Sequence, residues 1–93
     1  MIPVIFRKFS DGEVIALFPT LPGTNDPATC QSYLHVGQHG AADVGITGCT
    51  KLATESEYAA LLLELVAIGY DDLRIVRRFP ANAWDLRRQA VQS

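Results

Sequence analysis

The N-terminal part of the chain contains two apolar runs separated by a short polar segment. Residues 2–9 and 14–18 are rich in β-branched and aromatic side chains, and Asp11-Gly12 lies between them. An Asp-Gly pair in this position is a strong signal for a β-hairpin with a two-residue turn. The cross-strand pairs that this turn predicts are Phe9 with Val14, Arg7 with Ala16, and Ile5 with Phe18.

Both faces of this predicted hairpin are largely apolar. A sheet with one solvated face alternates between apolar and polar side chains, and this hairpin does not. Each face therefore needs a cover. Any apolar face or strand edge that the rest of the chain leaves free would be available for association.

Proline and glycine interrupt the apolar pattern in the middle of the chain. Residues 19–28 contain three prolines and a glycine and are predicted to form a loop. Residues 30–36 have the composition of a third strand. Four glycines follow between residues 37 and 48, and they indicate a long connection with a short strand at residues 44–46.

A helix is predicted to begin after Thr54. Thr54 and Glu57 have the spacing of a capping box, in which each residue satisfies a free amide of the other. Gly69 suits the left-handed position that ends a helix, with Tyr70 packing back on the last turn. The predicted buried face of this helix consists of Tyr58, Leu61, Leu62, Leu65 and Ile68.

The C-terminal part predicts one more strand and a short helix. Residues 73–79 alternate as in a strand, and Asn82 can cap a helix that starts at Ala83 and covers the second sheet face. The whole pattern predicts an α+β fold in β-β-β-α-β order. Its small, mostly antiparallel sheet of three to four strands would pack on one long helix. We expect a single domain over residues 1–93, with a core at 1–80 and a helical tail at 81–93.

Composition favours an ordinary globular protein. Apolar residues make up 48% of the 93 residues, charged residues 19%, and the net charge is −2. No apolar run is long enough to cross a bilayer, and the N-terminus has the reverse of a secretory signal's charge order. We therefore expect a cytoplasmic protein that does not bind membranes, with two free thiols.

The residues with the most reactive side chains cluster between Cys30 and Cys49. These two thiols, with His35 and His39, are of the types that bind zinc. However, an extended strand separates the two histidines by roughly 13 Å, and both would need to approach a zinc ion to about 2 Å. Two cysteines and two histidines in 93 residues suggest a nucleophilic pair by chance, and no carboxylate has a spacing that forces it near either histidine. We expect no metal, no cofactor and no catalytic residue, and favour a protein that is not an enzyme.

Two binding functions remain. The leading one is association with a protein partner or a second copy through the edge or an uncovered face of the sheet. The alternative is binding of single-stranded nucleic acid by a basic sheet patch that includes Arg7 and Lys8, although the negative net charge argues against it. A metal or catalytic site centred on the histidines is a further alternative. The candidate binding residues are Tyr33, His35, Gln38, His39, Arg74, Arg77 and Arg78.

Several segments resemble a group of short, uncharacterised bacterial proteins. They are residues 6–9, 12–19, 32–40, 69–70 and 73–76, so the resemblance extends over most of the chain up to Phe79. It implies an autonomous bacterial cytoplasmic domain of the kind found in accessory gene content. It supplies no activity, cofactor or site residue, and the tail around Trp84 lies outside it.

Overall fold

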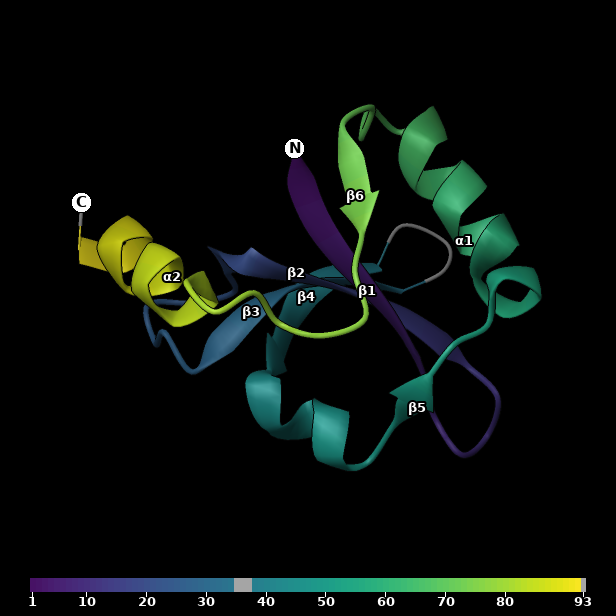
Figure 1. Cartoon of the computed structure of the whole chain (residues 1–93), viewed down its shortest axis with the longest axis horizontal. Helices are drawn as coiled ribbons and strands as arrows, with labels where there is room; N and C mark the ends of the chain where they lie inside the picture. The colour runs from purple at the N-terminus through teal and green to yellow at the C-terminus, as the bar shows by residue number, and fades with distance from the viewer. Residues whose placement is uncertain (35–37, 93) are drawn as a thin grey trace.

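The computed structural model describes residues 1–34 and 38–92 and has an α+β fold (Figure 1). The predicted fold class is therefore confirmed, whereas the predicted size of the sheet is wrong: the described residues form six strands, not three to four. The prediction of one long helix is also wrong, because the helix at this position has only 13 residues. The elements in chain order are β1 (Ile2–Lys8), β2 (Val14–Pro22), β3 (Thr29–Leu34), β4 (Gln38–Asp43), the 3-10 helix η1 (Val44–Gly48), β5 (Lys51–Leu52), α1 (Glu55–Ala67), β6 (Leu73–Ile75) and α2 (Ala83–Gln92).

The sheet is antiparallel except at one strand. Its order is β4-β3-β2-β1-β5, so the first four strands form a meander. β6 pairs with the first half of β1 in parallel, and β5 pairs with its last two residues in antiparallel fashion. Both short strands therefore share the side of β1 opposite β2, and β4 is left at the far end of the sheet.

The hairpin between β1 and β2 forms, but its register differs from the prediction. Lys8 lies opposite Val14 and Phe6 opposite Ala16. The loop has three residues instead of two. Phe9 donates its N–H to the Glu13 carbonyl at 2.8 Å, and Gly12 has a φ of 92°, which is the geometry of a type I turn followed by a bulge. One extra loop residue shifts the pairing by one position and changes which side chains share a face.

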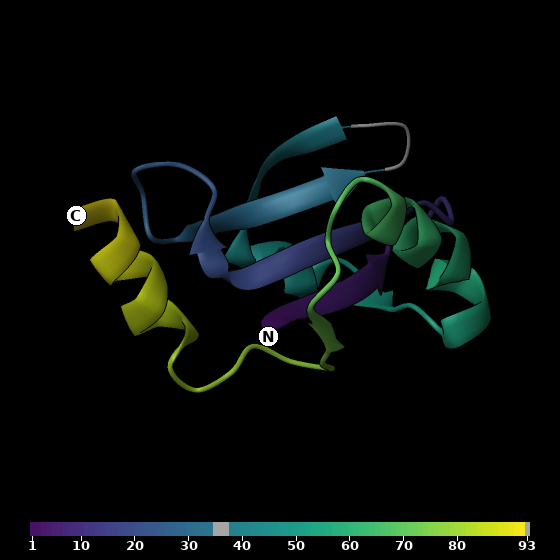
Figure 2. The same ribbon diagram turned by 90° about the horizontal axis from the view of Figure 1, so that it is seen from above.

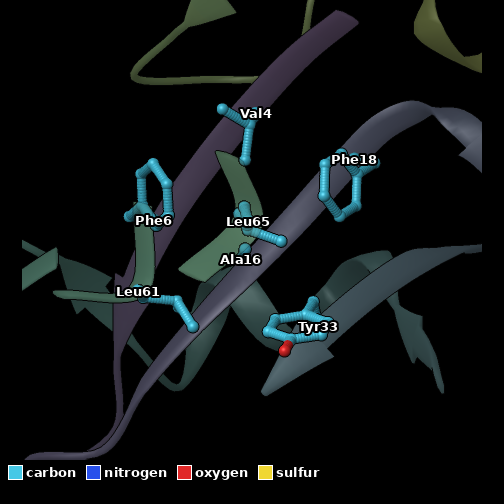
Figure 3. Packing of buried hydrophobic residues seen from close by; sticks show 7 residues of the cluster. All are labelled: Val4, Phe6, Ala16, Phe18, Tyr33, Leu61 and Leu65. Atoms are coloured by element: carbon cyan, nitrogen blue, oxygen red, sulfur yellow. The ribbon is translucent and has the colours of Figure 1, made fainter. Parts of the chain in front are cut away.

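Each face of the sheet carries its own apolar cluster. The face covered by α1, called the α1 face below, buries Val4, Phe6, Ala16, Phe18 and Tyr33 against Leu61 and Leu65 of α1 (Figure 3). The opposite face, called the η1 face, buries Ile5, Ile15, Leu17, Cys30 and Ala42. The sequence-based inference of a hairpin that is apolar on both sides is confirmed.

The cover of the η1 face is not the C-terminal helix. Val44 and Ile46 of η1, together with Val76 and Phe79 of the connection after β6, pack against its cluster. The predicted strand at residues 73–79 is therefore shorter in the structure, because β6 ends at Ile75 and the residues after it pack on the η1 face. Helix α2 instead lies beside the end of the sheet near β2 and β3 (Figures 1 and 2).

Helix α1 begins and ends as the sequence predicts. Its capping box forms, with the Thr54 N–H donating to the Glu57 carboxylate at 2.8 Å. At the other end Gly69 has a φ of 119°, and the Tyr70 N–H donates to the Leu65 carbonyl at 3.0 Å. Among the described residues, neither helix is both long and apolar enough to span a bilayer.

Glu57 gives the fold a defined pH dependence. Its carboxylate accepts a hydrogen bond from the Lys8 ammonium and one from the Thr54 N–H, which lowers its pKa from 4.5 to about 2. The unfolded chain therefore binds this proton more readily than the folded chain, so the stability that Glu57 contributes is complete above its unfolded pKa. It is lost as the pH falls from about 4.5 toward 2.

We expect Glu57→Gln to remove this dependence. Glutamine keeps the capping interaction but lacks the charge. In urea unfolding between pH 7 and pH 2, wild type should be the more stable protein at neutral pH, and the difference should close as the pH approaches 2. A difference that stays constant over this range would contradict the assigned role of Glu57.

Candidate functional site

The strand β4 forms an open edge of the sheet. In Figure 2 it is the outermost strand, with β3 on its inner side. Within the described residues it pairs with β3 alone, through six consecutive residue pairs from Leu34–Gln38 to Thr29–Asp43. Its residues from Gln38 to Ala41 are all exposed.

The backbone groups of alternate β4 residues point away from the sheet. The Val44 N–H donates to the Ala28 carbonyl at 2.9 Å, which makes these two residues a hydrogen-bonded pair at the end of the β3–β4 ladder. Hydrogen-bonded and non-hydrogen-bonded pairs alternate in an antiparallel ladder. Even-numbered residues of β4 therefore bond to β3, and the N–H and C=O groups of His39, Ala41 and Asp43 face outward.

β4 lacks the usual protection of an edge strand. Lysine, proline and bulges are the common means by which proteins prevent an edge from pairing. The sequence from Gln38 to Asp43 has no lysine and no proline, and the β3–β4 register continues without a shift. Gly40, Ala41 and Ala42 at its centre are small, so another strand could approach the backbone closely.

Next to this edge, an aromatic groove lies on the α1 face. It is lined by Tyr33, His39, Ile68, Gly69 and Tyr70 and has a volume of about 410 Å³. The rings of Tyr33 and His39 meet edge to face at a centroid distance of 4.7 Å. His39 Nε2 lies 3.4 Å from the Tyr70 hydroxyl. The groove can therefore accept a large side chain from a strand that pairs with β4.

No protein-family model, curated protein or solved structure matches this chain. The resemblance to short bacterial proteins therefore stays a prediction. The features that bear on function are the β4 edge and the groove beside it.

The predicted binding residues of β3 and β4 only partly converge. Tyr33 and His39 are directly paired and both lie at the groove. Gln38 is their neighbour in sequence, but strand alternation directs it to the η1 face. His35 lies outside the described residues.

The predicted arginines do not line this groove. Arg74 lies on β6, which pairs with β1, so β1, β2 and β3 separate it from β4. Arg77 and Arg78 are exposed in the connection that follows β6. The residues proposed for a basic sheet patch thus do not form one surface with Tyr33 and His39.

The two basic residues of β1, Arg7 and Lys8, are bound to other residues of the fold. Arg7 donates to the Thr50 hydroxyl at 3.0 Å and to the Thr47 carbonyl at 2.8 Å, which joins the η1 region to β1. Lys8 is paired with Glu57. Both cations therefore hold parts of the fold together.

The described members of the cysteine and histidine set, Cys30, His39 and Cys49, do not form a common centre. Cys30 is buried in the η1-face cluster, while His39 lies on the α1 face, and Cys49 is exposed after η1. Residues 1–34 and 38–92 contain no group of three or more histidine, cysteine or acidic side chains suited to hold a metal ion.

The two thiols should differ strongly in reactivity. Burial raises the pKa of the Cys30 thiol to about 11, and its exposed fraction is 0%, so the reactive thiolate is scarce and inaccessible. We expect native protein treated with iodoacetamide at pH 8 to carry one modification, at Cys49. Cys30 should react only after unfolding, as peptide mass analysis would show. Equal modification of both in the native state would contradict the packing of Cys30.

Sequence reasoning missed Ala41, Asp43 and Tyr70 as members of this region. The segment with Ala41 and Asp43 was interpreted as a connection, and the edge position of β4 depends on the strand order. Tyr70 was expected to pack back on the end of the helix. In the structure it also stacks on Phe18 at a centroid distance of 5.1 Å and reaches His39.

Proposed function

We propose that this protein is a small, non-enzymatic protein-binding module that associates by adding a strand to its sheet at β4. The observation that carries the proposal is the row of outward-facing backbone groups at His39, Ala41 and Asp43 on an exposed edge without lysine, proline or a bulge. Strand addition draws its affinity from such groups and its specificity from pockets for alternate side chains.

The association surface that we propose is narrower than the one expected from the sequence. Both sheet faces are covered by other parts of the chain, α1 on one side and η1 with residues 76–79 on the other. We therefore propose the free β4 edge, and not a sheet face, as the association surface. The groove at Tyr33, His39 and Tyr70 lies where every second side chain of an added strand would point.

A library of seven-residue peptides displayed on phage tests this proposal. We expect protein immobilised at low surface density to enrich peptides that are rich in β-branched and aromatic residues and can bind as an extended strand. Ala41→Pro should abolish their binding because proline lacks the N–H that points outward, whereas Ala41→Ser should retain it. Absence of enrichment, or equal binding by the proline variant, would refute strand addition at β4.

A further inference from the structure

We infer that the strand added to β4 is β4 of a second copy, paired in antiparallel fashion with Ala41 on the two-fold axis. This inference rests on the proposed function and names its partner. The pairing is isologous, so it closes at two subunits and joins the two sheets into one.

The backbone geometry limits how two β4 strands can pair. Residues that lie opposite each other in an antiparallel pair both direct their backbone groups toward the partner, or both direct them away. Since only odd-numbered residues of β4 face outward, an odd residue must lie opposite an odd residue. The register that would place Gln38 opposite Asp43 and pair the whole strand is therefore forbidden.

Two nearly complete registers remain, one centred on Gly40 and one on Ala41. The register centred on Gly40 pairs the outward groups of His39 and Ala41, and it places Asp43 opposite Gly37, which lies outside the described residues. The register centred on Ala41 pairs the outward groups of His39, Ala41 and Asp43 with one another. Within the described residues of β4, the second register is therefore the one that pairs every outward group.

Side-chain complementarity favours the same register. It places His39 of each copy directly opposite Asp43 of the other, at both ends of the paired segment. Directly opposed side chains have Cβ atoms about 5 Å apart, so the Asp43 carboxylate can accept a hydrogen bond from the imidazole of the other copy. Asp43 accepts the Gly45 N–H through Oδ1 at 2.7 Å, and its second oxygen can face the imidazole. In the other register His39 would face Ala41, and this complementarity would be lost.

Sedimentation equilibrium of the full chain tests the pairing. A short strand pair buries less than the roughly 1,200 Å² of a standard stable interface, so we expect a monomer–dimer equilibrium over micromolar to millimolar concentrations. Ala41→Pro should be monomeric throughout, and Ala41→Ser should dimerise like wild type. Circular dichroism verifies that the variants are folded. A monomeric wild type at 1 mM, or a dimer unaffected by the proline, would overturn the inference.

A pair of variants at His39 tests the register. Glutamate at this position would face Asp43 of the other copy, so we expect His39→Glu to weaken the dimer at least tenfold relative to His39→Gln. In the register centred on Gly40 the two variants should dimerise equally, and that result would reject the Ala41 axis.

Failure of the second copy as the partner can be distinguished from failure of the proposed function. A wild type that stays monomeric but still binds library peptides in a proline-sensitive way would reject the second copy as the partner and retain strand addition. A wild type that neither dimerises nor binds library peptides would reject strand addition itself.

Discussion

Arg87→Met is expected to lower the free energy of unfolding by about 3 kcal/mol. Arg87 is 2% exposed on α2, and it donates to the Pro19 carbonyl at 2.7 Å and to the Pro27 carbonyl at 2.8 Å. Methionine fills much of the same volume but donates no hydrogen bond. Because a buried carbonyl that loses its donor costs about 1–3 kcal/mol, α2 should lose its attachment to the end of β2 and to the β2–β3 connection.

Arg88→Met is the matched control for this variant. Arg88 is the next residue, is exposed and forms a surface pair with Asp85 at 3.7 Å, so its replacement should change the stability by less than about 0.5 kcal/mol. Urea unfolding monitored by Trp84 fluorescence and by circular dichroism measures both variants. Similar losses for the two variants would show that the buried guanidinium is not what holds α2 in place.

Gly23→Ala is the second variant with a large expected effect, about 2 kcal/mol of destabilisation. A methyl group at Gly23 would lie 2.6 Å from the Ala41 Cβ and 2.6 Å from the Cys30 carbonyl oxygen. Both distances are shorter than van der Waals contact, and the Cys30 carbonyl belongs to the backbone of β3. The connection between β2 and β3, or β4 itself, must therefore move.

Gly48→Ala provides the comparison, since a methyl group there meets nothing within 4 Å. Its stability should be unchanged or slightly higher. Chemical denaturation compares the two variants, and NMR chemical shifts of Ala41 and Ala42 report whether β4 moves in Gly23→Ala. Equal stability of Gly23→Ala and Gly48→Ala would contradict the close packing of this connection against β4.

The helix and the two-sided hairpin could be predicted because local sequence determines them. Thr54 and Glu57 specify the start of α1, and Gly69 specifies its end, through contacts within one or two turns. The hairpin register could not be predicted because it depends on a loop of three residues instead of two. Asp11-Gly12 is compatible with either loop.

β4 was missed because its residues have weak strand propensity. Glycine, alanine and aspartate are depleted in strands, and pairing with β3 supplies the order that the sequence does not. The small side chains at the centre of β4 give no strand signal in the sequence, and they also leave the edge of this strand accessible. The candidate site therefore could not be inferred from residue types, and the prediction reached it only through Tyr33, Gln38 and His39.

The prediction that the C-terminal helix covers a sheet face was wrong for a different reason. Its apolar residues Trp84 and Leu86 suggested a cover for the sheet, but they are 48% and 38% exposed. α2 instead buries Ala83 and Arg87. A buried arginine that binds backbone carbonyls has no pattern in the local sequence, because its acceptors lie more than 50 residues away in the chain.

Amide hydrogen exchange measured by NMR at several protein concentrations tests the open β4 edge most directly. The N–H groups of Gly40 and Ala42 bond to β3, so their protection should not depend on concentration. Those of His39 and Ala41 face outward, so they should exchange rapidly in dilute protein and become protected as the concentration rises. Rapid exchange of His39 and Ala41 at every concentration, up to 1 mM, would contradict the pairing of two copies through this edge.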